Sequence, residues 1–372
     1  MRVVILCDWL PPDFGAVGQY ALAYGHDLAR AANQVTLVGL STRGSSETTI
    51  DAHPGRLRVR RVARPTYDKR SLAKRSVWTL FSNLALLWHA RRDLRRADEV
   101  QFTGSPPYLI HFVQPLAMLL RVRTRYRITD FHPECTMAEY ERVPPWLSLL
   151  HRLTVYWRRR VDTIEIISED QRPHLLAQGI NPRRIELRRD ASPVQFTSGQ
   201  PVARPPDALR GRRVLLYSGN WGVAHDADTL VRGLTRYEAL RPGTVGLWLN
   251  ATGSRVEEIQ RRLEGRAACA RTGPVPIEAL AGVLAAADIH VICLRDAFVG
   301  YVLPSKVYAC IDSRRPILYI GSERSDVHML CEAAARQRLI QYRRVDVGDY
   351  RGVSGAITSL LSATDEQRIR AA

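Results

Sequence analysis

Short apolar runs alternate with amphipathic segments along the chain. The first run, residues 3–6, leads through a loop into a helical pattern that ends near Ala29, and a second run follows at 34–40. This order predicts a β-loop-α-β unit, which is how an α/β domain begins. Further strands are expected in this half at 57–62, 99–102, 126–129, 163–167 and 184–187.

A second alternation of the same kind begins after a change in composition. Residues 191–210 contain four prolines and no long apolar period, which is typical of a linker between domains. Beyond it, strands are expected at 213–218, 245–250, 289–294 and 316–320, and helices from 227, at 255–263, at 276–286 and near Ser305. No internal repeat of 20–50 residues is visible, so the pattern excludes solenoids and propellers.

Length and composition agree with two α/β domains. The 372 residues suffice for two cores, and 45% hydrophobic with 24% charged residues excludes a disordered chain. The six cysteines are scattered without a Cys-x-x-Cys pair, which argues against a zinc ribbon or a disulfide scaffold and suits a reducing compartment. The N-terminal apolar run is too short for a signal peptide. The uncharged run 101–120 contains Pro106, Pro107 and Pro115 and is expected to form strand, turn and core helix.

The net charge of +17 is concentrated in one segment. Residues 56–96 hold 13 basic and 2 acidic side chains, a net +11. Within it, residues 71–92 place Val77, Leu80, Phe81, Leu84 and Trp88 on one helical face between basic clusters. The pattern fits a helix on an anionic membrane surface and equally a core helix of the first domain with basic flanks. We therefore expect a cytoplasmic protein that binds peripherally to the inner face of the cytoplasmic membrane.

Lysine is rare in this sequence, which draws attention to one position. Only Lys69, Lys74 and Lys306 are lysines among 54 basic residues. Pro304 and Ser305 form a helix-start pattern directly before Lys306. The N–H groups of a first helical turn and a neighbouring lysine can bind an anion and stabilise the charge of a leaving diphosphate. The alternative is an ordinary capped helix with a solvated lysine.

Three short motifs lie next to predicted strands or helix starts. Gly15-Ala-Val-Gly18 follows the first strand, where a backbone without Cβ atoms can approach a ligand; the alternative is a structural turn. It is not a dinucleotide fingerprint, which makes an NAD site improbable. Asp130-Phe-His-Pro-Glu134 follows the strand at 126–129, at the end where open α/β sheets bind ligands, and no third ligand for a metal is evident beside it. Asp226-Ala-Asp228 is interpreted as a helix cap.

These motifs together resemble the retaining GT-B glycosyltransferases of family 4, over nearly the whole length. The resemblance is clearest in the two motifs just described at 15–18 and 130–134, in 216–226, in 273–276 and in Pro304-Ser-Lys-Val-Tyr308 with Pro316. It is closest to bacterial members with Gly-Asn-x-Gly and Pro-Ser-Lys-x-Tyr, several of which build surface polysaccharides on lipid carriers. The family's usual Glu-x7-Glu pair would fall on Tyr301 and Ala309, and its usual Arg and Lys on Asn220 and His225. The ribose contact is therefore not identified.

The fold implied is GT-B, with two Rossmann-like domains facing across a cleft. An acceptor domain would span 1–195 and a nucleotide-sugar domain 205–350, and a helix at 351–372 would return to the first domain. The resemblance implies a metal-independent, retaining hexosyl transfer from a nucleotide-diphosphate sugar, preferably of UDP type, to a hydroxyl of a lipid-linked or small-molecule acceptor, without another cofactor. Lys306 and His132 are the expected catalytic residues, and Asp130 and Glu134 the acceptor-side residues. The expected donor-binding residues are Gly15, Gly18, Gly219, Asn220, His225, Gly253, Val275, Arg295, Leu303, Pro304, Ser305 and Tyr308.

Two other functions are alternatives to this hypothesis. A sugar-nucleotide 2-epimerase shares the architecture, and would produce a C2 epimer from its nucleotide sugar without an acceptor. A basic nucleic-acid-binding protein would account for the charge, but the sequence contains no helix-turn-helix, zinc finger or aromatic RNA platform. Because the excess charge lies in one flank of the first domain, we expect no nucleic-acid partner.

Overall fold

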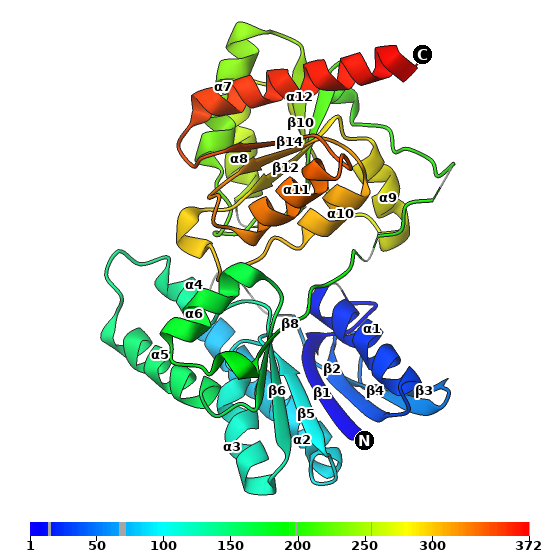
Figure 1. Cartoon of the computed structure of the whole chain (residues 1–372), viewed down its shortest axis with the longest axis vertical. Coiled ribbons are helices and arrows are strands. Elements are labelled where there is room, and N and C mark those ends of the chain that lie inside the picture. The colour runs from blue at the N-terminus through cyan, green and yellow to red at the C-terminus, as the bar shows by residue number, and fades with distance from the viewer. Residues whose placement is uncertain (14–15, 67–71, 193, 198, 254, 372) are drawn as a thin grey trace. The chain divides into compact units, whose positions relative to one another are not determined.

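The computed structural model describes residues 1–13, 16–66, 72–192, 194–197, 199–253 and 255–371 and contains two compact units (Figure 1). The first unit spans Met1–Arg189 and the second Asp190–Ala372. Their boundary falls beside the proline-rich segment 191–210. Each unit is an α/β domain with a mostly parallel sheet, so the predicted fold class is confirmed.

The first unit is built on an eight-stranded sheet of order β3-β4-β2-β1-β5-β6-β7-β8. All neighbouring strands pair in parallel except β3, which is antiparallel to β4. The strands are β1 Arg2–Trp9, β2 Gln34–Ser41, β3 Ser46–Ala52, β4 Gly55–Ala63, β5 Glu99–Thr103, β6 Arg123–Ile128, β7 Thr163–Ile166 and β8 Ile185–Leu187.

Helices cover both faces of this sheet. On β4, Leu57 and Val59 join the apolar core under α1 (Ala16–Arg30), while Arg58 and Arg60 bond to Asp93 of α2 (Leu72–Leu94). Because alternate residues of a strand point to opposite faces, α1 and α2 lie on opposite faces. The helix α3 (Ile110–Leu120) contacts both α2 and α5 (Pro145–Arg158). The remaining helices of this unit are α4 Glu134–Met137 and α6 Arg172–Ala177.

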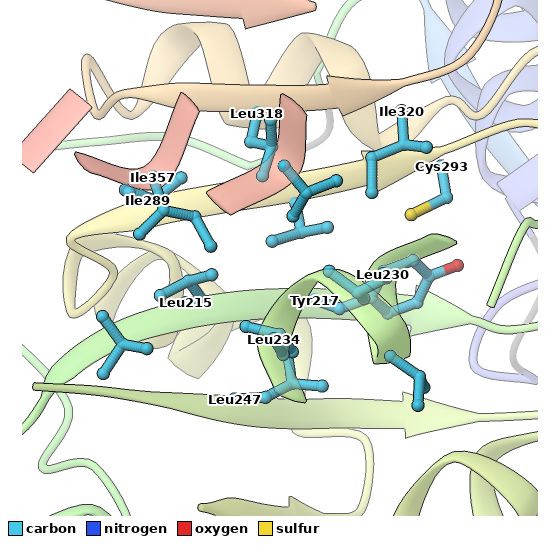
Figure 2. Close-up of a cluster of buried hydrophobic side chains, with 14 of the residues drawn as sticks. Leu215, Tyr217, Leu230, Leu234, Leu247, Ile289, Cys293, Leu318, Ile320 and Ile357 are labelled. Atoms are coloured by element: carbon cyan, nitrogen blue, oxygen red, sulfur yellow. The ribbon is translucent and has the colours of Figure 1, made fainter. Parts of the chain in front are cut away.

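The second unit has a fully parallel six-stranded sheet of order β11-β10-β9-β12-β13-β14, the doubly wound order of a Rossmann domain. Its strands are β9 Arg213–Asn220, β10 Val245–Thr252, β11 Cys269–Thr272, β12 Ile289–Cys293, β13 Ile317–Ile320 and β14 Tyr342–Val345. Its helices are α7 Asp228–Leu240, α8 Val256–Leu263, α9 Ile277–Ala285, α10 Lys306–Asp312, α11 Asp326–Arg336 and α12 Tyr350–Ala371. Apolar side chains of the strands and of α7 and α12 form its main core (Figure 2).

Both sheets reverse their winding direction at one pair of strands. In the first unit this topological switch point lies between β1 and β5, and in the second between β9 and β12. Open α/β sheets bind ligands outside the carboxyl ends of the strands at such points, because the helices that follow the two strands depart to opposite faces. The two switch points are therefore the expected positions of ligand-binding sites.

The structure also contains elements that the sequence pattern did not predict. The strands β3, β11 and β14 lie at sheet edges and are short or rich in polar residues, so neither alternation nor a long apolar run marks them. The predicted C-terminal helix is present as α12, whose Val353 and Ile357 pack in the core of the second unit. Its return to the first domain stays a prediction. All six cysteines lie in the described ranges, and no disulfide joins them.

Candidate functional site

A lysine without a hydrogen-bond partner lies at the switch point of the second unit. Lys306 is the first residue of α10, and its Nζ is buried with no hydrogen-bond partner among the residues that the structure describes. The ammonium lies over the ring of Tyr217 on β9, 3.1 Å from the ring centroid. A cation over an aromatic face gains ~1–2 kcal/mol, less than burial of a charge costs. Burial accordingly lowers the pKa of Lys306 to about 7.

Among the described residues, no carboxylate contributes to the shifted pKa of Lys306. The groups that influence its pKa besides burial are the thiols of Cys293 and Cys310, and burial raises the pKa of both thiols, so they are neutral. Tyr217 and Cys293 lie on β9 and β12 at the carboxyl end of the core (Figure 2). A buried cation in a neutral setting has its electrostatic demand unmet, and a bound anion would satisfy it.

Two of the predicted glycines have backbone conformations that favour glycine. Gly219, at the end of β9, has φ +121°, and a Cβ there would lie 3.5 Å from Cε of Lys306. Gly253 has φ +123°, and its Cβ would lie 2.3 Å from the carbonyl oxygen of Trp221. Both positions therefore require glycine, the first for backbone conformation and the second also for a close approach of two backbones.

His225 and Arg295 hold the loop between β9 and α7. The Nδ1 of His225 lies 2.7 Å from the carbonyl oxygen of Cys293 and donates to it, and burial, followed by the charge of Lys306, lowers the pKa of His225 to about 3. His225 is thus neutral with its proton on Nδ1. The Nη1 of Arg295 donates to the carbonyl of Val223 at 3.1 Å. In the same loop Asp226 Oδ2 accepts from the N–H of Thr229 at 3.2 Å, which confirms the capping interpretation.

The other predicted donor residues of the second unit surround α10 or the end of β9. Ser305 precedes α10, and its hydroxyl makes no capping hydrogen bond, whereas Leu303 and Pro304 are buried. Tyr308 lies in the first turn of α10. Asn220 is exposed, and its carbonyl accepts from the hydroxyl of Tyr217 at 3.0 Å.

An amide network links the carboxyl ends of three strands in this unit. Asn250 on β10 accepts from the hydroxyl of Ser218 at 3.0 Å and donates to the carbonyl of Gly273 at 2.6 Å. It thereby fixes the backbone that leads to Val275. This residue packs against a second apolar cluster of the unit, which includes Leu216, Trp248 and Ala309. A Cβ at Gly273 would meet no atom within 4 Å, so the network borders open space. Asn250 was not predicted, because an asparagine inside an apolar run shows only as a break in the pattern.

The family's glutamate positions have different environments. Ala309 is buried in the second apolar cluster of this unit, where a carboxylate would have to lose its hydration. Tyr301 is partly exposed in the loop before α10. Neither position supplies a carboxylate, in agreement with the departure noted in the sequence.

The switch point of the first unit holds two carboxylates instead of a cation. Asp8, at the end of β1, accepts from the hydroxyl of Ser105 after β5 at 2.6 Å, while its Oδ1 is buried without a hydrogen-bond partner in the described part of the chain. Asp130 follows β6, and its pKa is raised to about 6 by burial and by the charge of Asp8. Burial raises the pKa of Asp8 to about 6 as well. Asp8 was missed in the sequence, although a carboxylate at the end of the first strand could have marked it.

His132, two residues after Asp130, is a neutral imidazole. Burial lowers its pKa to about 4, and its ring lies 6.0 Å from the ring of Tyr108. The carbonyl of His132 accepts from Nη2 of Arg158 at 3.0 Å. This bond fixes the loop 130–134 to α5.

Glu134 is engaged in a buried ion pair. Arg158 of α5 bonds to both carboxylate oxygens, with Nη2 3.1 Å from Oε2, and Gln178 donates to Oε1 at 2.8 Å. Burial alone would raise the pKa of Glu134, but the charge of Arg158 and the hydrogen bonds from His151 and Arg158 together hold that pKa far below its usual range. Since its oxygens are occupied, the geometry favours a positioning role for Glu134, and its contact with an acceptor stays a prediction. No sequence pattern indicated Arg158, because a fully buried arginine is rare.

The glycine motif of the first unit is described only in part. Gly15 lies outside the described residues. Gly18 is buried in α1, and a Cβ there would lie 1.8 Å from the carbonyl oxygen of Trp9. A glycine is thus required at position 18, where α1 passes close to the end of β1, whether or not this residue also contacts a ligand.

Comparisons with solved structures identify the fold. The chain is similar to an α,α-trehalose-phosphate synthase (UDP-forming) from Burkholderia vietnamiensis, with 14% identity, a TM-score of 0.62 and coverage of 97% of this chain and 92% of that one. It is also similar to Anabaena Alr3699/HepE in complex with UDP, with 11% identity, a TM-score of 0.59 and coverage of 98% and 91%. A trehalose-6-phosphate protein from E. coli bound with UDP-2-fluoro glucose is similar at 13% identity and a TM-score of 0.63. The match covers 97% of this chain and 91% of that one. The sequence matches no protein-family model and no curated protein.

The likeness shows the GT-B class of fold, with two Rossmann-like domains, as the sequence predicted. The low identities carry no residue assignment. Within the described ranges, no three His, Cys, Asp or Glu side chains are grouped so as to hold a metal ion.

Proposed function

We propose that this chain is a retaining, metal-independent glycosyltransferase of the family 4 type, in the Gly-Asn and Pro-Ser-Lys subgroup. It moves a hexosyl group from a UDP-type sugar to a hydroxyl acceptor. The observation that carries the proposal is the buried Lys306, without a hydrogen-bond partner in the described residues, at the switch point of the second unit. The GT-B neighbours support it, since one is UDP-forming and two contain UDP or a UDP-sugar analogue.

The donor diphosphate would bind beside Lys306 and the backbone N–H groups around Ser305. When the bond between the sugar C1 and the diphosphate oxygen breaks, the oxygen keeps the electron pair, and the ammonium stabilises the new charge. Because Lys306 is already desolvated, no water has to leave it as that charge develops. His225 is neutral and adds no positive charge, so charge stabilisation would fall to Lys306, with Arg295 as a second cation of the site.

The acceptor would bind to the first unit. Asp8 and Asp130 can accept hydrogen bonds from its hydroxyl, and His132 would contact the transferred sugar. In same-face attack the new bond forms between the acceptor oxygen and C1, and the leaving phosphate oxygen takes the acceptor proton. The resemblance to retaining enzymes supports this stereochemistry.

The test measures UDP binding and donor turnover in three proteins. Calorimetric titration with UDP is expected to show binding to the wild type and a large loss in Lys306→Ala. With a UDP-sugar and an alcohol acceptor, Lys306→Ala should lower turnover by about 10²–10³, as for removal of a preorganised donor. Arg236→Ala, an exposed residue of α7, is the matched control and should behave as wild type. Turnover of Lys306→Ala within threefold of wild type, or a C2 epimer formed without an acceptor, would contradict the proposal.

Membrane association is the second part of the proposal. The apolar stripe of α2 lies outward, with Trp88 63% exposed, while Leu86, Ala90 and Leu94 of the same helix are buried. This orientation supports the membrane interpretation over the core interpretation of the stripe. Four arginines of the adjacent strand β4 are already engaged, Arg56 with Asp51, Arg58 and Arg60 with Glu47 and Asp93, and Arg61 with the carbonyl of Pro11.

Exposed arginines of this region lie near the end of α2 and directly after it, at Arg92, Arg95 and Arg96. In the described helices no segment is both long and apolar enough to cross a bilayer. We propose peripheral binding at the inner face of the cytoplasmic membrane, next to a lipid-linked acceptor. Sedimentation with anionic vesicles should exceed that with neutral vesicles; equal sedimentation would contradict it.

A further inference from the structure

A second exposed apolar stripe runs along α5. Trp146, Leu149, Leu153 and Tyr156 follow one another at spacings of three and four residues, and Leu149 is 67% exposed. The opposite side of the helix buries Leu147, Thr154 and Arg158. Spacings of three and four place the four side chains on one side of the helix. A monomeric protein rarely leaves such a row in water unless something covers it.

The helix that carries this stripe is connected to α2 through α3. The helix α3 contacts both α2 and α5, and it ends in Met118 and Leu119, the latter 80% exposed. Three neighbouring helices of the first unit thus present large apolar side chains to the outside. The sequence pattern alone predicts such an apolar face only for α2.

The charge of these three helices is almost entirely positive. Their only acidic residue is Asp93, whose carboxylate is paired with Arg58 and Arg60. Exposed arginines adjoin the stripes, at Arg92 in α2, Arg121 after α3, and Arg152, Arg159 and Arg160 in or after α5. The exposed glutamates closest in sequence to α5, Glu139 and Glu141, lie in the loop before it.

Aromatic rings of both stripes are paired with guanidinium groups. The Cζ of Arg160 lies 3.4 Å from the ring centroid of Tyr156, and that of Arg91 lies 4.0 Å from the ring of Trp88. Tryptophan and tyrosine prefer the headgroup level of a bilayer, and arginine there bonds to lipid phosphates. Apolar rows with such aromatic and basic groups match an anionic membrane interface.

We propose that the stripe of α5 is a second membrane-binding element, and that α2 and α5 lie together on one anionic bilayer. The inference rests on the proposed membrane association of α2 and deepens it. A second copy of the chain is a poorer occupant, because it would bring an equally basic face against this one. An anionic bilayer offers apolar depth and negative headgroups at once.

The experiment compares binding of the full chain to phosphatidylcholine vesicles with and without phosphatidylglycerol. The α5 variant carries Trp146→Gln, Leu149→Gln and Leu153→Gln, and the α2 variant carries Phe81→Gln, Leu84→Gln and Trp88→Gln. The control carries Leu240→Gln, Ile277→Gln and Met329→Gln, three exposed apolar residues of the second unit. Retention of the wild-type circular dichroism spectrum establishes that each variant is folded.

The α5 variant and the α2 variant should each lose about tenfold or more in partition onto the anionic vesicles, because each removes several apolar groups from the interface. The control should bind as the wild type, and the single variant Leu149→Gln should lose less than the triple variant. If only the α2 variant loses binding, the role of α5 is overturned while membrane association stands. If the wild type binds no vesicles, both proposals fail. If the α5 variant instead turns a dimer into a monomer and still binds vesicles, the stripe is an interface between copies.

Discussion

The two switch points of this molecule differ in how their charges are compensated. In the second unit Lys306 is buried against Tyr217 with no hydrogen-bond partner in the described residues. In the first unit the guanidinium of Arg158 is paired with both carboxylate oxygens of Glu134, while the pKa values of Asp8 and Asp130 are raised to about 6. Within the described part of the chain, the buried ammonium of Lys306 therefore lacks the paired counter-ion that Arg158 has in Glu134. The contrast separates a cation whose charge a bound anion could compensate from one that the folded chain already compensates.

The sharpest test of this contrast removes each cation. Arg158→Met leaves Glu134 buried without its main partner, and should lower the free energy of unfolding by about 3–5 kcal/mol. Lys306→Met removes a cation that is buried without a hydrogen-bond partner, and should leave stability unchanged or slightly higher. Urea unfolding monitored by circular dichroism measures both. Equal destabilisation by the two variants would show that Lys306 is compensated in the ligand-free protein.

A second test uses acid. Burial lowers the pKa of His225 and His290 in the second unit to about 3, below the unfolded value of about 6.5. As the pH falls below about 6.5, the unfolded state binds protons at these histidines and the folded state does not. The free energy of unfolding therefore decreases. At pH 5 the loss is about 2 kcal/mol for each histidine, about 4 kcal/mol in all.

The first unit should respond less to the same change. His111 and His132, with pKa values lowered to about 4, act in the same direction. Asp8 and Asp130, with pKa values raised to about 6, act in the opposite direction, since the folded state takes up their protons before the unfolded state does.

Pulse hydrogen exchange at a fixed labelling pH, after equilibration in urea at pH 7 or pH 5, separates the two units by their peptides. The second unit should lose protection at lower urea when equilibrated at pH 5. His290→Gln, which removes one of its two titrating groups, should reduce that loss by about half. A first unit that loses as much stability as the second would contradict the comparison.

The position of most strands along the chain and the strand ends that carry chemistry could be predicted from the sequence, because buried strands leave apolar runs and the motifs follow them directly. The order of the strands within each sheet came only from the structure. Lys306 was found because lysine is rare in the chain. Tyr217 beneath it could not be found, since an aromatic residue inside an apolar run indicates only burial. Arg158 escaped for the opposite reason: its partner Glu134 is 24 residues earlier, and only the folded chain joins them.

The direction of an amphipathic face was also beyond the sequence. The stripe of α2 was recognised, but whether it lay inward or outward depended on which residues α3 and the sheet cover. Ser82 and Asn83 are buried while Phe81 and Leu84 are exposed, the reverse of what polarity alone predicts. Such a reversal is a departure that local patterns do not encode.

A third test asks whether Lys306 binds the diphosphate as a cation. Its pKa of about 7 means that the free protein is largely neutral at this position above pH 7. Bound diphosphate would raise that pKa, so binding above pH 7 takes up a proton and UDP affinity should fall by up to tenfold for each pH unit. Titration between pH 7 and pH 8.5 avoids protonation of UDP itself, whose last phosphate pKa is about 6. Lys306→Arg stays charged and should show little pH dependence; an unchanged slope in this variant would assign the proton to another group.

The smallest expected effect concerns the space beside Asn250. We expect the uracil base of the donor to lie there, near residues 273–275. A methyl group at Gly273 meets nothing within 4 Å, so Gly273→Ala should change the free energy of unfolding by less than about 0.5 kcal/mol. If the base occupies that space, the methyl group overpacks it, and UDP affinity should fall about fivefold, close to 1 kcal/mol. Gly355→Ala is the matched control, because its added methyl also meets nothing within 4 Å. Gly355 lies in α12, which follows the last strand of the second unit. Unchanged UDP affinity in Gly273→Ala would place the base elsewhere, and would leave the diphosphate role of Lys306 intact, because the two variants act on different parts of one ligand.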